Sequence, residues 1–178
     1  MTDELIDILN KDYSFQKTAL KSEAHKYGWL HASVHIWFYT ETEELLLQKR
    51  SATKIAFPNV WDVSVAGHIG TKESPLESAL REIKEEIGLE IEKESLKPIG
   101  TYHEHQQFNP AYIDNELHYI YKCKLEKRFS ELKIQKEELT ALKLIPIKLF
   151  RQEIKELNHD YAKHPTDYYL QILNNLEQ

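Results

Sequence analysis

Cysteine is nearly absent from this chain, and long apolar runs are missing altogether. The 178 residues include one cysteine, Cys123, so no disulfide can form within the chain. No apolar stretch approaches the roughly 20 residues that a membrane-spanning helix needs, so we expect no membrane partner. The opening stretch, MTDELIDILNKD, is acidic and has no signal-peptide pattern, which favours a cytoplasmic location.

Positive charge is also in deficit. The chain has 23 Lys and Arg against 29 Asp and Glu, a formal net charge of −6. Such a surface does not attract nucleic acid, so a phosphate-bearing ligand would need local lysines, arginines or a metal ion. Repeats, low-complexity tracts and linkers are lacking as well. We therefore expect one domain over residues 1–178, and the sequence sets no oligomeric state.

The stretch GHIGTKESPLESALREIKEEIGL, residues 67–89, has the features of a loop that leads into a helix. Ser74 is a good N-cap, Pro75 suits the first helical position, and Glu77 completes a capping box. Gly88 is placed to end the helix in a left-handed conformation. The apolar residues recur at helical spacing and predict one buried stripe, made of Leu76, Ala79, Leu80, Ile83 and Ile87.

Glutamates gather on another face of this predicted helix. Glu82, Glu85 and Glu86 lie about one turn apart, and Glu73 in the preceding loop could fold back towards them. Like charges at this spacing repel, and a bound divalent cation would offset the repulsion. Mg²⁺ and similar hard cations prefer oxygen ligands. Taken alone, however, REIKEE is more simply a solvated surface of Glu and Lys.

The residue pattern over the longer stretch 67–89 favours the interpretation of these glutamates as a cation-binding site. This stretch resembles the full signature of the Nudix hydrolases at all nine specified positions. Its pattern is Gly67, five residues, Glu73, seven residues, then Arg81-Glu82-aliphatic-x-Glu85-Glu86-x-Gly88-aliphatic. The resemblance implies an α/β fold, a Nudix-type α/β/α sandwich with a mixed sheet. It also implies attack of water on the diphosphate linkage of a small organic diphosphate, with Mg²⁺ or Mn²⁺ as cofactor.

The resemblance also assigns roles to positions. The metal-binding and catalytic positions that it implies are Gly67, through its backbone carbonyl, Arg81, Glu82, Glu85 and Glu86. In this family the general base often lies outside the signature, and the candidates are Glu116, Asp114 and Glu104, in that order. Glu116 comes first because it opens a predicted strand after a polar, aromatic loop at 106–116. An exposed loop acid is the plainer interpretation of each.

Outside the signature, several stretches resemble the isopentenyl-diphosphate isomerase branch of the Nudix superfamily. They are Lys21-Ser22-Glu23-Ala24-His25, Leu30-His31, Lys49-Arg50 with Lys54, Pro58-Asn59-Val60-Trp61, Gly67-His68 and Asp114-Asn115-Glu116. In that branch the matching positions imply a second metal site, formed by His25, His31, His68, Asp114 and Glu116. Lys21, Arg50 and Lys54 would bind the diphosphate. Imidazoles with carboxylates suit a divalent transition metal or a Mg²⁺-like ion, although any single histidine is as readily structural.

The isomerase resemblance breaks at one position. The branch uses a cysteine just before the Gly-His pair, and Ala66 stands there in this chain. Alanine cannot transfer a proton, and Cys123 lies far along the chain. We therefore expect a hydrolase built on an isomerase-like frame. The alternatives are a true isomerase and a non-catalytic ligand sensor, although a sensor has no need of a repulsive glutamate cluster.

Three other histidines are predicted to lie outside the metal site. His35 shares a strand face with His31 but lies about 13 Å away, at roughly 3.3 Å per residue. His103 and His105 are interpreted as structural. The remaining pattern predicts strands at 4–9, 15–20, 30–39, 45–49, 63–66, 96–108, 116–125 and 139–147, and helices at 22–27, 148–157 and 165–177.

Overall fold

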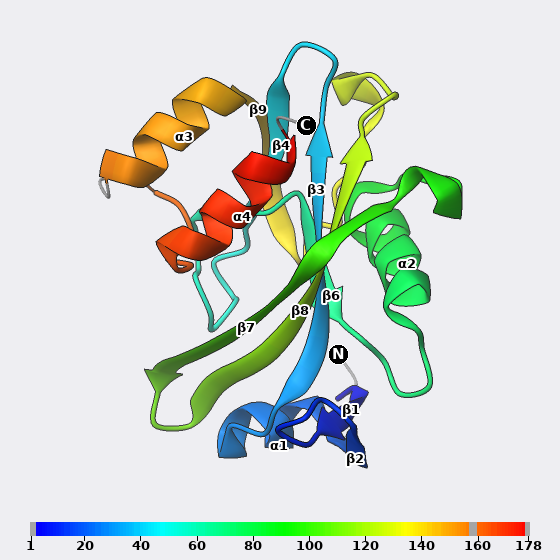
Figure 1. The fold of residues 1–178 in the computed structure, drawn as a ribbon, viewed down its shortest axis with the longest axis vertical. Coiled ribbons are helices and arrows are strands. Elements are labelled where there is room, and N and C mark those ends of the chain that lie inside the picture. Colours follow the sequence, from blue (N-terminus) through cyan, green and yellow to red (C-terminus); the bar gives the residue numbers. More distant parts are fainter. Residues whose placement is uncertain (1–2, 157–159, 177–178) are drawn as a thin grey trace.

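A mixed sheet lies between two layers of helices in the computed structural model, which describes residues 3–156 and 160–176. Helix α2 (Pro75–Ile87) covers one face of the sheet, and α3 (Ile147–Glu156) and α4 (Thr166–Leu176) cover the other (Figure 1). This arrangement confirms the predicted α/β/α sandwich. Within the described ranges, every helix falls short of the length and apolarity that crossing a membrane requires.

The sheet has nine strands within the described residues. In chain order they are β1 (Leu5–Leu9), β2 (Phe15–Leu20), β3 (His31–Tyr39), β4 (Glu44–Arg50), β5 (Trp61–Asp62), β6 (Val65–His68), β7 (Lys97–Asn109), β8 (Tyr112–Lys124) and β9 (Leu139–Pro146). Helix α1 (Lys21–Tyr27) follows the β1–β2 hairpin and ends at Gly28, which adopts the left-handed conformation at φ 62°. Short 3₁₀ turns occupy Lys93–Ser95 and Phe129–Glu131.

Strand β3 is the centre of the sheet. One edge pairs in parallel with β8 along its whole length, and β8 continues into an antiparallel hairpin with β7. The other edge of β3 is shared in turn by β1, β6 and β4. The parallel pair makes the sheet mixed, as predicted. It also sets His31 beside Glu116 and Ser33 beside His118, which becomes important at the site.

Two apolar clusters hold the layers together. Ala79, Ile83 and Ile87 of α2 are fully buried against the face of β3 that carries Val34 and Ile36. On the other face, a second cluster joins Trp37 to the two C-terminal helices, as expected for a core tryptophan. Since residues of a strand alternate between faces, the odd-numbered residues of β3 point away from α2 and towards α4.

Most predicted elements are confirmed, and one detail is wrong. The loop predicted at 106–116 is instead a hairpin end, because β7 and β8 stay paired down to Asn109 and Tyr112 and leave a two-residue turn. In that hairpin, pairing between two neighbouring strands outweighs the loop-like composition of the stretch. The strand predicted at 45–49 is confirmed as β4, which pairs with β3 at Leu45, with β5 at Gln48 and Lys49, and with β9 along its length. The ends predicted at residues 157 and 177 lie outside the described residues.

The capping box of α2 gives a first prediction. Ser74 Oγ accepts a hydrogen bond from the Glu77 N–H at 3.3 Å, and Glu77 Oε2 accepts from the Ser74 N–H at 2.8 Å. Ser74→Ala should lower the free energy of unfolding in urea by about 1 kcal/mol, because a helix N–H loses its partner. Ser130→Ala, at an exposed serine in a 3₁₀ turn, should change it far less. Equal effects would mean that the cap does not stabilise α2.

Candidate active site

A cavity of about 810 Å³ gathers the residues that the sequence singled out. Its walls include α1, β3, the end of β4 with the loop after it, β6, α2, the β7–β8 hairpin and the segment before α4. Every predicted site residue lines it except His31, which lies fully buried behind the others. His103 and His105 are exposed on β7 and are not among the lining residues, consistent with their predicted exclusion.

The Glu82 side chain of α2 reaches the backbone of β6 at Gly67. A Cβ at Gly67 would overlap the Glu82 carboxylate. One turn further along, Glu86 is buried, and its Oε2 accepts a hydrogen bond from the Ala66 N–H at 3.2 Å. Burial raises the pKa of Glu82 to about 7 and the pKa of Glu86 to about 8. The glycine of the signature is therefore the residue that admits a desolvated carboxylate under the strand.

Arg81 connects the glutamates of the signature. Its Nη1 donates to Glu82 Oε1 at 2.7 Å and to Glu85 Oε2 at 3.2 Å. Its Nη2 donates to Glu73 Oε2 at 3.0 Å and to the His68 carbonyl at 3.1 Å. Glu73 does fold back, as predicted, but onto this guanidinium, and it is not among the residues that line the cavity. The guanidinium thus fixes the relative positions of three carboxylates.

Three histidines meet at the Glu116 carboxylate on the other side of β6. Glu116 Oε1 lies 3.6 Å from His31 Nε2 and 3.5 Å from His68 Nε2. His68 Nε2 is also 3.2 Å from His25 Nε2. The ligand atoms of this His25–His31–His68–Glu116 group all lie within 4.8 Å of one another, a spacing that can hold a metal ion.

The opposite ring nitrogens of this group are already engaged. His25 Nδ1 lies 2.8 Å from Asp114 Oδ1, and His31 Nδ1 lies 2.8 Å from the Trp29 carbonyl. Asp114 is therefore placed behind His25, away from the nitrogens that converge on Glu116. Burial lowers the pKa of His68 to about 3, whereas Glu116 outweighs burial at His31 and raises its pKa. Histidines that are held through Nδ1 and present Nε2 are typical of metal ligands.

The three predicted phosphate-binding cations lie around the cavity, each beside a carboxylate. Lys21 Nζ is 3.5 Å from Glu4 Oε2. Arg50 Nη1 is 3.4 Å from Asp62 Oδ2, while Lys54 forms an ion pair with Glu138. Burial, together with the neighbouring Arg50 and Lys21, lowers the pKa of Lys54 to about 8. In a complex with a phosphate ligand, phosphate oxygens would therefore replace these carboxylates as the partners of the three cations.

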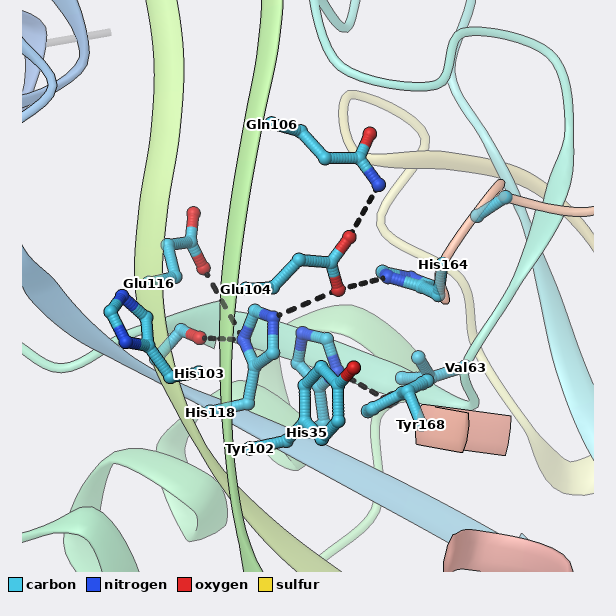
Figure 2. A network of polar contacts seen from close by, with 12 residues as sticks. His35, Val63, Tyr102, His103, Glu104, Gln106, Glu116, His118, His164 and Tyr168 are labelled. Carbon is cyan, nitrogen blue, oxygen red and sulfur yellow. Dashed lines mark hydrogen bonds and ion pairs between the residues drawn. The ribbon is translucent and has the colours of Figure 1, made fainter. Parts of the chain in front are cut away.

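A second polar group in the cavity was missed by the sequence analysis (Figure 2). His164, just before α4, lies between two carboxylates, with Nδ1 at 2.8 Å from Glu104 Oε2 and Nε2 at 3.1 Å from Asp62 Oδ1. His118 Nε2 is 3.4 Å from the same Glu104 oxygen. The His35 ring stacks on the His118 ring, with centroids 4.0 Å apart. Of this group, only Glu104 was a sequence candidate.

One signal for the missed group was present in the sequence. Two-residue spacing in a strand puts Glu116 and His118 on one face, and it puts His31, Ser33 and His35 on one face of β3. His35 is indeed outside the His31 group, as predicted. Finding its partners required the register of β3 against β8. His164 had no local signal, because only the return of the C-terminal segment brings it to the cavity.

The fold and the glutamate-bearing helix are those of the Nudix class. Residues 29–166 match the family model of the NUDIX domain, and the chain belongs to the Nudix family. It is 33% identical over 171 residues to Nudix hydrolase 3 of Arabidopsis thaliana, covering 92% of this chain but 22% of that protein, about a fifth of its length. The crystal structure of DR0079 from Deinococcus radiodurans superposes with a TM-score of 0.74 at 16% identity, covering 98% of this chain and 100% of that one.

The isomerase branch also appears among the relatives. Isopentenyl-diphosphate Delta-isomerase of Salmonella paratyphi B is 29% identical over 141 residues, which is 78% of this chain and 75% of that protein. The resemblance to this branch is therefore confirmed. Among the relatives, proteins named Nudix hydrolases are matched over most of this chain.

The buried His164 gives a pH-dependent prediction. Burial alone would lower its pKa, but Asp62 and Glu104 outweigh burial and raise it to about 10. This pKa is above the ordinary value of about 6.5. The charged His164 imidazole therefore stabilises the folded protein fully below about pH 6.5, and this stabilisation is lost as the pH rises towards 10. The unfolding free energy that His164→Gln removes should therefore be larger at about pH 6 than at about pH 10.

Urea denaturation of both proteins at the two pH values measures this difference. His103→Gln, at an exposed histidine, is the matched control and should show no such trend. A loss in His164→Gln that stays constant with pH would mean that the imidazole is not held in its charged form.

Proposed function

We propose that the protein hydrolyses the diphosphate linkage of a small organic diphosphate by attack of water, with Mg²⁺ or Mn²⁺ as cofactor. One observation carries this proposal. The carboxylates of Glu82 and Glu86 are desolvated under β6 and line the same cavity as the cationic side chains of Arg50 and Lys54. Carboxylates for a metal ion and cationic groups for phosphate thus line one space.

The donor set fits a hard divalent cation. Glu82, Glu85 and Glu86 offer carboxylate oxygens, and the Gly67 carbonyl belongs to the strand directly above Glu82. Burial disfavours the charged forms of Glu82 and Glu86, and a cation would favour them again. When bound, such an ion lowers the pKa of water and stabilises negative charge on phosphate oxygens.

The chain's own residues would then position the reactants. Arg81 holds Glu82 and Glu85 in fixed geometry through charge-assisted hydrogen bonds. Lys21, Arg50 and Lys54 would bind the diphosphate by charge, and their present carboxylate partners show that each head group already faces negative oxygens. Phosphoryl transfer depends mainly on such alignment and charge neutralisation, so little covalent chemistry is required of the protein.

Three carboxylates remain candidates for the general base. All three line the cavity, and Glu116 stays first because its contacts to histidine nitrogens exceed hydrogen-bond length. Asp114 is next to His25. Glu104 lies beside His118 and His164, which together outweigh burial and lower the Glu104 pKa to about 2. The His25–His31–His68–Glu116 group is in addition a second candidate metal site, with Asp114 placed to orient His25.

Isomerisation of isopentenyl diphosphate is the second candidate, and the Salmonella relatives favour it. Against it, Ala66 pairs with His35 in the sheet and offers no proton-transferring group. Cys123, the chain's single cysteine, is buried in the apolar cluster under α2, and burial raises the pKa of its thiol to about 11. The third candidate is a ligand sensor, whose function would not require the cluster of buried glutamates.

A panel of nucleoside, sugar, dinucleotide and isoprenoid diphosphates, assayed with Mg²⁺, tests the proposal. We expect release of phosphate products from at least one member, and Glu86→Gln should lower turnover about a hundredfold or more, because it removes a cation-binding carboxylate. Glu90→Gln, at an exposed glutamate just beyond α2, is the control and should retain turnover. Allylic product without hydrolysis would favour the isomerase, and binding without turnover would favour the sensor.

The basic residues give a separate prediction. Arg50→Ala and Lys54→Ala should each raise KM about tenfold with a smaller change in kcat, because each removes a charged contact to substrate phosphate. Lys97→Ala, at an exposed lysine at the start of β7, should leave KM unchanged. An unchanged KM in both cavity variants would remove these side chains from the binding site.

A further inference from the structure

We propose that His164 is a positioning residue for phosphate binding, because it binds the buried Asp62 carboxylate and so leaves the Arg50 guanidinium free for a substrate. Asp62 lies between the two side chains, with Oδ1 at 3.1 Å from His164 Nε2 and Oδ2 at 3.4 Å from Arg50 Nη1. The inference rests on the proposed function, since it concerns a cation that would bind the diphosphate in the same cavity. It adds a residue from outside the signature to that role.

The contacts of His164 require a charged imidazole. Its Nδ1 lies 2.8 Å from Glu104 Oε2 (Figure 2), and its Nε2 faces the Asp62 carboxylate. Burial raises the pKa of both carboxyl groups, but contacts that include His164 outweigh burial and lower it below the usual range. An ionised carboxylate only accepts hydrogen bonds, so each ring nitrogen must carry a proton. Arg50, Asp62, His164 and Glu104 therefore form a row of alternating charges.

The two oxygens of Asp62 are not held equally. Oδ1 accepts a hydrogen bond from the Val63 N–H at 2.8 Å in addition to the one from His164. Within the described chain, Oδ2 has Arg50 Nη1 as its one partner, at 3.4 Å. Strong charge-assisted hydrogen bonds are shorter, roughly 2.7–2.9 Å. Asp62 is thus bound mainly through His164 and the neighbouring backbone, and its contact with Arg50 is weak.

Arg50 is held at the cavity but is not fully engaged. Its Nε donates to the Ala56 carbonyl at 3.0 Å, which fixes the guanidinium at the cavity wall. Its Nη1 makes the one long contact with Asp62, and its Nη2 donates to no residue that the structure describes. The terminal nitrogens therefore retain donors for a phosphate, which guanidinium groups bind through paired hydrogen bonds.

Without His164, Asp62 would compete with the substrate for Arg50. The Asp62 side chain is 4% exposed, and a buried carboxylate that loses one cationic partner depends more strongly on the other. Burial would raise the pKa of Asp62, and His164 opposes this effect more than Arg50 does, so His164 is the larger source of compensation. In its absence Arg50 would be drawn towards Asp62, and a phosphate would have to displace a carboxylate to bind the guanidinium.

Binding of methylenediphosphonate, a diphosphate analogue that water does not cleave, tests the inference by titration calorimetry with Mg²⁺ present. His164→Gln and Arg50→Ala should each weaken binding about tenfold, because each takes the guanidinium away from the phosphate. Adding Asp62→Asn to His164→Gln should restore the affinity, since the competing charge is gone. A merely structural role would not be rescued, because the double variant has lost more contacts. His105→Gln, at an exposed histidine on β7, should bind like the unmodified protein.

Asp62→Asn alone guards against loss of fold in His164→Gln, and it should bind the analogue more tightly than the unmodified protein. Equal or weaker binding by this variant would overturn the inference. So would a His164→Gln protein that keeps its far-ultraviolet circular dichroism and binds with unchanged affinity, or whose loss Asp62→Asn does not rescue. A loss in Arg50→Ala without one in His164→Gln would contradict this inference alone. The expected affinities without hydrolysis of any diphosphate in the panel would contradict the proposed function alone.

Discussion

The contact of the Glu82 carboxylate with the backbone of β6 at Gly67 is the constraint on which the cavity depends. Gly67 has no side chain, so the Glu82 carboxylate can occupy the space beneath the strand. Glu86 is buried one turn later against the backbone of Ala66. Burying carboxylates costs free energy unless charge or hydrogen bonds compensate. Arg81 compensates Glu82, whereas Glu86 has one backbone N–H, which is why a bound cation gives the best account of this helix.

The same strand connects the glutamates to the histidines. Ala66 and His68 of β6 are paired with His35 and Ser33 of β3, so β6 has carboxylates on one side and imidazoles on the other. The parallel register of β3 with β8 then sets Glu116 and His118 beside these rings. A few residues of backbone therefore bring together oxygen ligands that suit Mg²⁺ and nitrogen ligands that suit transition metals.

The local features of the chain could be predicted, and the non-local ones could not. Ser74, Glu77 and Gly88 delimit α2 through contacts within a few residues, and the structure confirms each role. His25, His68 and Glu116, which the resemblance to known sequences had grouped, line one cavity.

One missed feature is a local hairpin, and the others depend on distant parts of the chain. The β7–β8 hairpin extends through a stretch that has the composition of a loop, because paired backbone outweighs local turn preference. His118 is identified only when the register of two strands is known, and His164 only when the C-terminal segment is seen to return. Lys54 was correctly placed at the cavity, but its partner Glu138 lies 84 residues away and has no local signal.

Anomalous X-ray scattering from crystals grown with Mn²⁺ tests the central claim most directly. The proposed hydrolase site requires a peak within bonding distance of carboxylate oxygens of Glu82 and Glu86, on the side of β6 that faces the cavity. A peak confined to the histidines, or carboxylates that turn out to bulk solvent with no ion between them, would contradict it.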